Sequence, residues 1–474
     1  MTLRIYPRAS AASDRLQVWV GVDDVIAPPA LTWTLDGAPA DPTVVRPLMS
    51  ARPPALLSGN PPRTFTGIFE FAAVPGKTYR VAVQAGGEQD AAVMRAVPAE
   101  VPGGLAELRI MLVSCYHRAN DRARAALQIK EIAKAQAVDL ILFLGDQVYL
   151  DLPPIVNFQE DKFWLANHFE RQEYAPNWFG AWEGAFRVAP AVFIPDDHEY
   201  WNNFPHAAPH IQNTWTTPGQ AHWKDAADAM WLAFQQPGGL GPGDAFRRDI
   251  SPLSILALDT RTDRQKDESR CMTAAAAAAL HKWADDVIDN RWLGVLATGQ
   301  SIFEERVPGI GSRIKDGHLA NHADYRLLSE ALRRITDARL PVLCLTGDVH
   351  WGRLLFTKRL DLAPALVEVI SSPVSLLSAG FLDAPRRWWA RLRGNLDETW
   401  PLFGEAPEDR DARYPKTSFP GHTFERQYPN KGNQVVMLSF AAITKRTVNV
   451  KTTFYPIHPE KKLPAHAIEF PLQL

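Results

Sequence analysis

The chain has 474 residues, of which 46% are hydrophobic and 22% are charged, as in proteins that fold around an apolar core. Its 51 basic and 53 acidic residues leave a formal net charge of −2, which excludes the large basic field that nonspecific nucleic-acid binding requires. The length favours two or three domains. Three cysteines are too few for a disulfide framework, and no apolar stretch is long enough to span a bilayer.

The N-terminal residues MTLRIYPRASAASDRLQVWV contain neither an apolar signal-peptide core nor a pair of arginines. We therefore expect a cytoplasmic protein without a transmembrane segment. A periplasmic location is the alternative if a leader precedes these residues. The composition predicts no nucleic-acid-binding surface, and no motif specifies an oligomeric state.

Residues 1–103 alternate between apolar and polar side chains with a period of two, which predicts short strands. The predicted strands are LRIYPRAS (3–10), RLQVWVGV (15–22), LTWTLDG (31–37), RTFTGIFEF (63–71) and KTYRVAVQA (77–85). Turn signals separate them, and no helical pattern lies between them. We therefore expect an immunoglobulin- or fibronectin-like β-sandwich domain at 1–103.

From residue 104 the pattern changes to apolar strands that alternate with helices, which indicates an α/β domain over 104–474. Strands are predicted at 108–115, 138–146, 191–197, 254–260, 294–300 and 341–348, and helices at 121–137, 179–188, 272–288 and 323–338. A closing hairpin is expected at 435–443 and 448–457. The segment 380–432 is rich in Pro and Trp with little periodicity, which is typical of a lid or binding loop.

Four predicted strands end in polar residues that can bind metals. These groups are Ser114-Cys115-Tyr116-His117, Gly145-Asp146-Gln147-Val148-Tyr149, Asp196-Asp197-His198-Glu199 followed by Asn202-Asn203, and Gly347-Asp348-Val349-His350. Each group alone has an ordinary explanation, such as a turn or a helix cap. Their recurrence at successive strand ends favours a shared metal site, because such ends meet at one edge of a sheet.

In this order the four motifs resemble those of the PhoD-type alkaline phosphatases, a branch of the calcineurin-like metallophosphoesterases. The phrase Asp259-Thr260-Arg261, which follows a predicted strand, also resembles that family. The resemblance covers residues 105–460 approximately. It implies an α/β fold in which an α/β/β/α sandwich carries the site and an all-β sandwich domain precedes it.

The resemblance also implies two metal ions that share Asp146. Cys115, Tyr149 and His350 would complete one site, which suits a transition metal such as the family's Fe³⁺ because its ligands are a thiolate, a phenolate and an imidazole. The second site would be built from oxygen ligands, which suit Ca²⁺, Mn²⁺ or Mg²⁺. Its predicted ligands are Asp146, Asp197 and Asp348, with Asp196 and Asn203 as further candidates.

The implied reaction is hydrolysis of a small phosphate mono- or diester by water activated between the two metals. His198 is predicted to bind the phosphate or protonate the leaving group, and Arg261 to bind phosphate. Structural roles are at least as consistent with the remaining candidates, which are His117, Arg264, Gln300 and Arg353. Two alternatives stay open: a catalytically silent metal-binding or interaction module, and a peripheral phosphodiesterase that contacts phospholipid head groups through the basic segment 385–393.

Overall fold

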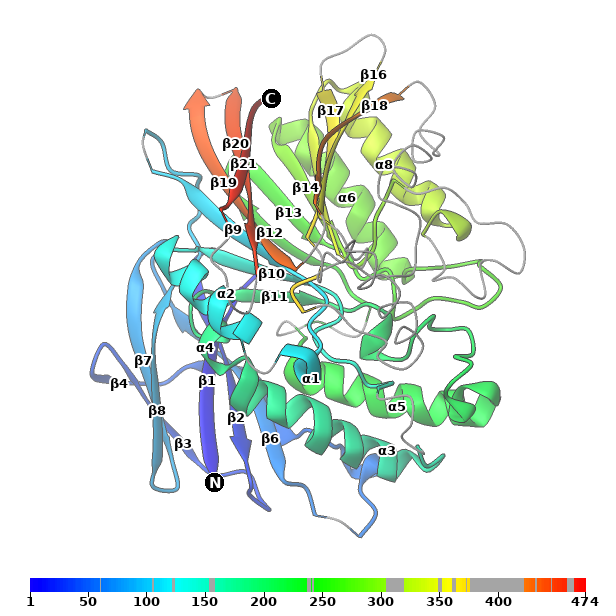
Figure 1. Cartoon of the computed structure of the whole chain (residues 1–474). Coiled ribbons are helices and arrows are strands. Elements are labelled where there is room, and N and C mark those ends of the chain that lie inside the picture. The colour runs from blue at the N-terminus through cyan, green and yellow to red at the C-terminus, as the bar shows by residue number, and fades with distance from the viewer. Residues whose placement is uncertain are drawn as a thin grey trace, which may run out of the picture.

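A computed structural model shows two large β-sheets that lie face to face between layers of helices (Figure 1). The structure describes residues 1–59, 61–104, 106–121, 124–152, 158–236, 240, 243–303, 319–347, 352–359, 364–371, 373–375, 422–430, 433–444, 446–457 and 464–474. The predicted ligands Asp348 and His350, the basic segment 385–393 and all of the predicted lid before residue 422 lie outside the described residues.

The N-terminal strands form a sandwich of antiparallel sheets. The strands are β1 (Thr2–Arg8), β2 (Arg15–Asp23), β3 (Leu31–Leu35), β4 (Ala38–Ala40), β5 (Thr43–Ser50), β6 (Thr64–Ala72), β7 (Thr78–Ala85) and β8 (Glu88–Arg95), with a 3-10 turn at η1 (Pro54–Leu56). The sheet β4-β3-β7-β8 packs against β1, β2 and β6 through alternate apolar residues such as Val20, Phe69 and Val81. The predicted β-sandwich is confirmed.

The N-terminal strands β1, β2, β6 and β5 belong to the first of the two large sheets. They join its other strands because β1 pairs in parallel with β11 at Arg8 and Ala191. The additional strands are β9 (Leu108–Val113), β10 (Leu140–Leu144), β11 (Ala191–Ile194), β19 (Gln434–Thr444), β20 (Thr447–Pro456) and β21 (His466–Gln473). The order is β21-β20-β19-β9-β10-β11-β1-β2-β6-β5, and β19 and β20 form the expected closing hairpin. A domain boundary near residue 103 stays a prediction.

The second central sheet has seven strands in the order β12-β13-β14-β15-β17-β16-β18. They are β12 (Phe246–Ile250), β13 (Leu253–Ala257), β14 (Leu293–Thr298), β15 (Val342–Thr346), β16 (Gly352–Arg359), β17 (Pro364–Ile370) and β18 (His422–Asn430). Apolar side chains of both sheets meet between them, among them Leu142, Val295 and Leu345. Strands such as β10 are buried along their whole length because both faces are covered.

Helices cover the outer faces of the two sheets. The first sheet is covered by α2 (Arg124–Ala135), α3 (Lys162–His168), α4 (Glu183–Phe186) and α5 (Thr217–Phe234), and the second by α6 (Ala274–Asn290) and α8 (Tyr325–Asp337). Shorter helical segments are α1 (Arg118–Asp121), η2 (Phe169–Tyr174), η3 (Asn177–Ala181), η4 (Asp197–Glu199), η5 (Gln212–Trp215) and η6 (Leu319–Asn321). These layers confirm the predicted α/β/β/α sandwich.

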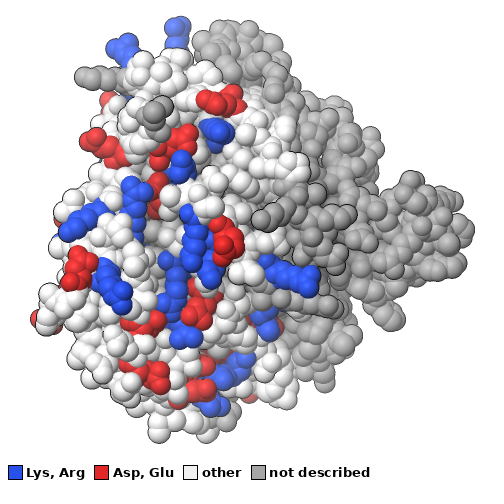
Figure 2. Space-filling view, turned by 60° about the vertical axis from the view of Figure 1, so that its left-hand side comes forward, with Lys and Arg blue, Asp and Glu red and all other residues white. Residues whose placement is uncertain are grey.

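The surface carries both signs of charge. On the face shown in Figure 2, the side chains of Lys and Arg alternate with those of Asp and Glu, so that neither sign forms a continuous field there. None of the helices in the described part of the chain is both long enough and apolar enough to cross a membrane.

Candidate metal centre

The polar residues that follow β9, β10 and β11 lie at one edge of the first sheet, because these three strands run in parallel. The second sheet contacts the first sheet at this edge. The amide of Gly347, just after β15, donates a hydrogen bond to Gly299 O at 3.1 Å. A Cβ atom at Gly347 would lie 2.0 Å from Leu144 O, so this close approach requires a residue without a side chain.

Three of the predicted site residues have left-handed backbone conformations. The φ angle is +56° at Cys115, +59° at Asp146 and +65° at Asn203. Such conformations cost about 1–3 kcal/mol for residues other than glycine and persist only where surrounding contacts impose them. The structure supplies such contacts: Cys115 N donates to Gly145 O at 3.2 Å, and Tyr116 N donates to Asp146 O at 2.8 Å.

Cys115 and Tyr149 converge on one oxygen of Asp146. The Cys115 Sγ and the Tyr149 hydroxyl each lie 3.5 Å from Asp146 Oδ2, and all three residues are buried. Ligands that bind one transition metal at about 2.0–2.3 Å are separated from each other by roughly 3–3.6 Å. The spacing and the donor atoms therefore fit the predicted transition-metal site, whose fourth predicted ligand, His350, lies outside the described residues.

Asp197 and His198 approach Asp146 as well. One donor atom from each of these three residues lies within 4.8 Å of the others, and all three are buried, so the group could hold a metal ion. Asp197 Oδ2 also accepts a hydrogen bond from Asn203 N at 2.7 Å, which fixes the orientation of the carboxylate. His198, predicted to act on substrate, thus lies beside the predicted ligands.

Burial raises the pKa of Asp146 well above its usual value, and the nearby carboxylates of Asp197, Asp196 and Glu199 raise it further, whereas the charge of His198 opposes the shift. Burial likewise raises the pKa of the Tyr149 phenol. A cation would relieve both effects, because it stabilises the ionised forms.

Asp151, which lies outside the four sequence motifs, orients His198. Its Oδ1 lies 2.8 Å from His198 Nδ1, and its Oδ2 accepts a hydrogen bond from Asn202 N at 3.0 Å. His210 Nε2 lies 3.7 Å from the same Oδ2 and reaches toward solvent, with 30% of its side chain exposed. The only signal for Asp151 in the sequence is its place five residues after Asp146.

Asp151 and His198 stabilise each other's charged forms. Burial alone would lower the pKa of His198, but the carboxylates of Asp151, Asp197 and Asp146 outweigh burial and raise it well above the usual value. Burial alone would raise the pKa of Asp151, but the charge of His198 and hydrogen bonds from His198, His210 and Asn202 lower it. Each residue therefore favours the charged form of the other.

Glu199 holds the backbone of the centre in place. Its two oxygens accept hydrogen bonds from the amides of Asp146 at 2.9 Å, Gln147 at 2.7 Å and Asp196 at 2.8 Å. These amides follow β10 and β11, so one fully buried carboxylate joins the ends of both strands. Glu199 belongs to the third sequence motif, but nothing in that motif predicts this role.

Arg261 and Asp196 contact each other inside the protein. Arg261 Nε donates to Asp196 Oδ1 at 2.6 Å, and its NH1 donates to Phe204 O at 3.1 Å. Its side chain is 0% exposed, and its guanidinium forms an ion pair with Asp196. Phosphate binding by Arg261 and metal binding by Asp196 stay predictions.

Of the four weaker candidates, one faces the centre and three are paired with other side chains. His117 faces the centre, since its ring contacts that of Tyr149 with centroids 5.3 Å apart. Arg264 donates to the Gln300 side chain, and Arg353 forms a fully buried ion pair with Glu368. Arg264, Gln300 and Arg353 therefore make structural contacts.

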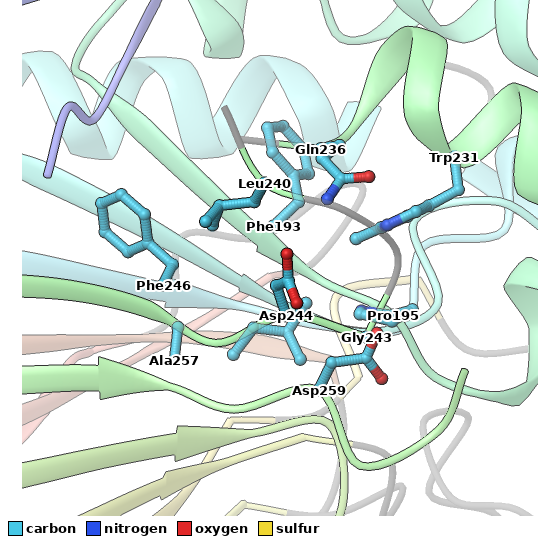
Figure 3. A pocket seen from close by; sticks show the side chains of 11 residues that line it. Phe193, Pro195, Trp231, Gln236, Leu240, Gly243, Asp244, Phe246, Ala257 and Asp259 are labelled. Atoms are coloured by element: carbon cyan, nitrogen blue, oxygen red, sulfur yellow. The ribbon is translucent and has the colours of Figure 1, made fainter. Parts of the chain in front are cut away.

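A small cavity lies beside the centre and is too small for a substrate. Figure 3 shows that Asp244, Asp259 and Gln236 point toward it from among apolar side chains such as Phe193 and Phe246. Its volume of about 20 Å³ accommodates a single water molecule. The cavity therefore belongs to the packing behind β11 and β13.

No family model matches the chain, and no curated protein sequence matches it. Among solved structures, PhoD superposes with a TM-score of 0.62 and 14% identity over 99% of this chain and 90% of that chain. A single mutant of Vps29 from Entamoeba histolytica gives a TM-score of 0.28 and 7% identity over 77% of this chain and 99% of that chain, too low to support an argument. The likeness to PhoD is one of fold, and it confirms the predicted fold.

Proposed function

We propose that the chain is a metal-dependent phosphoesterase that hydrolyses small phosphate mono- or diesters at the centre around Asp146. The observation that carries this proposal is the buried convergence of Cys115, Tyr149, Asp197 and His198 on Asp146. Burying several ionisable groups together is costly unless cations neutralise them. The fold that this chain shares with PhoD supports the same function.

The donor atoms support two unlike metal positions. The thiol of Cys115 and the phenol of Tyr149 suit a transition metal, for which we propose Fe³⁺, and the carboxylate of Asp197 suits Ca²⁺, Mn²⁺ or Mg²⁺. Asp146 would be shared between them, and Asp348 and His350 would complete the two ligand sets. When bound, such cations acidify water and neutralise the charge on phosphoryl oxygens.

His198 is the proposed proton donor to the leaving group. Because Asp151 engages Nδ1, the other ring nitrogen is the one left to face the centre. The raised pKa favours the protonated ring, in which this nitrogen can donate a hydrogen bond to phosphate or a proton to the departing oxygen. Asp151 holds the ring in this orientation from a fully buried position.

The proposal is tested by elemental analysis of the purified protein together with hydrolysis of p-nitrophenyl phosphate and bis(p-nitrophenyl) phosphate. We expect bound metal and cleavage of at least one ester, with both lost in Asp146→Asn. Protein that holds its full metal content but cleaves neither ester would instead support the catalytically silent metal-binding module.

A further inference from the structure

The C-terminal end of α5 is held by side chains from the N-terminal strands. Helix ends leave carbonyl groups that lack partners within the helix. At α5 the carbonyls of residues 232–234 accept hydrogen bonds from Arg46 in β5, from Trp19 in β2 and from Arg8 in β1. Trp19 Nε1 and Arg46 NH2 both donate to the carbonyl of residue 233 at 2.9 Å. Helix α5 contacts β6, the strand that neighbours β2 and β5.

The two arginines are cations at the negative end of the helix dipole. Burial lowers the pKa of Arg8 to about 9, with a contribution from the nearby charge of Arg46, and burial lowers the pKa of Arg46 to about 10. Both therefore stay charged at neutral pH. The carbonyls of α5 stabilise these charges, and the Phe193 ring, 4.2 Å from the Arg8 guanidinium, adds a cation–π contact.

Gln235 follows α5 directly and reaches the metal centre. Its Nε2 donates to Gln147 Oε1 at 2.8 Å and to Glu199 Oε1 at 3.3 Å, and its Oε1 accepts from the Tyr174 hydroxyl at 2.7 Å. Gln235 is fully buried. Glu199 is the carboxylate that holds the amide of Asp146, so a continuous series of contacts joins the N-terminal strands to the proposed shared ligand.

We propose that Arg8, Trp19 and Arg46 are positioning residues for the metal centre and that they act through Gln235. The N-terminal sandwich would thereby set the metal affinity of the centre. The physical reason is the left-handed backbone of Asp146, which relaxes if Glu199 loses support and then moves the carboxylate away from its metal-binding position. This inference rests on the proposed function only in that the centre binds metal.

The test compares Mn²⁺ binding by metal-stripped, full-length variants in isothermal titration calorimetry. Arg46→Met keeps the apolar stem and removes the guanidinium, and Gln235→Met keeps the chain length and removes the amide. We expect both to bind Mn²⁺ about tenfold more weakly, the usual effect of losing a partner behind a ligand. Arg46→Lys should restore part of the affinity. The control is Arg63→Met, which removes an exposed arginine from the same segment.

Wild-type Mn²⁺ affinity in both folded Met variants would overturn the proposal. Should Arg46→Met fail to fold, as judged by circular dichroism, Gln235→Met decides alone. Wild-type protein that binds Mn²⁺ but cleaves no phosphate ester would refute the proposed function. The role of Arg46 and Gln235 would then still be decided by the Mn²⁺ affinities of the two Met variants. Wild-type protein that binds no Mn²⁺ would overturn both.

Discussion

Replacing Asp151 with asparagine removes a charge without changing the shape of the side chain. The carboxylate accepts hydrogen bonds on both oxygens, from His198 Nδ1 at 2.8 Å and from Asn202 N at 3.0 Å. An amide can accept only one of them, since its NH₂ group is a donor. The substitution therefore weakens the hold on the His198 ring and removes the largest of the charge effects that raise its pKa.

The size of the effect follows from the loss of a buried hydrogen bond to a charged group, worth about 1.5–3 kcal/mol. If this energy is expressed in the transition state, kcat falls by about tenfold to a hundredfold, at 1.36 kcal/mol per factor of ten. The lower pKa of His198 also moves the alkaline limb of the pH–rate profile to lower pH, because the ring loses its proton earlier as the pH rises.

The assay is hydrolysis of phenyl phosphate and p-nitrophenyl phosphate by Asp151→Asn, with metal content measured in parallel. The loss should be larger for phenyl phosphate, because its poorer leaving group depends more on a proton donor. Asp286→Asn, which removes a carboxylate from the surface of α6, is the control. Equal losses on both esters, or loss of metal, would refute the role of Asp151 in holding a proton donor.

Three further changes test other parts of the structure. Cys115→Ser should weaken binding of the transition metal at least about tenfold, measured by elemental analysis, while the oxygen-ligand position keeps its metal. Burial raises the pKa of Glu173 from 4.5 to about 8, so the folded state holds a proton that the unfolded state releases, and stability should fall as the pH rises through that window. Glu173→Gln should flatten this dependence in thermal melts, and an unchanged profile would contradict the assignment. Gly347→Ala should cost about 1–3 kcal/mol or more in urea unfolding because its Cβ meets Leu144 O, whereas Gly103→Ala, whose Cβ meets nothing within 4 Å, should cost little.

The strands of the central sheets could be predicted because they are buried on both faces and appear as continuous apolar runs, as in β10. The predicted helices at 121–137, 272–288 and 323–338 are confirmed with ends that differ by a few residues. Helix α5 was missed because its last turns are buried on several sides, which removes the polar face that marks an amphipathic helix. The pairing of β1 with β11 joins distant segments and has no local signal.

In the candidate site, too, residues in local motifs could be predicted, whereas tertiary contacts could not. Cys115, Asp146, Tyr149, Asp197 and His198 were predicted together because each follows a strand in a sequence motif, and the structure brings them together. The side chains that contact these residues from behind were not predicted to do so. Asp151 and Glu199 contact the centre through tertiary packing, and the predicted phosphate ligand Arg261 finds its partner, Asp196, 65 residues earlier in the chain.

Anomalous X-ray diffraction from crystals of the protein would show directly whether metal ions bind around Asp146. Data collected at the absorption edges of the bound metals locate each ion independently of any assumed ligand. We expect anomalous peaks within about 2.0–2.6 Å of the Asp146 carboxylate, one of them also within bonding distance of Cys115 and Tyr149. Crystals of protein active on phosphate esters that show no peak within bonding distance of Asp146 would contradict this expectation.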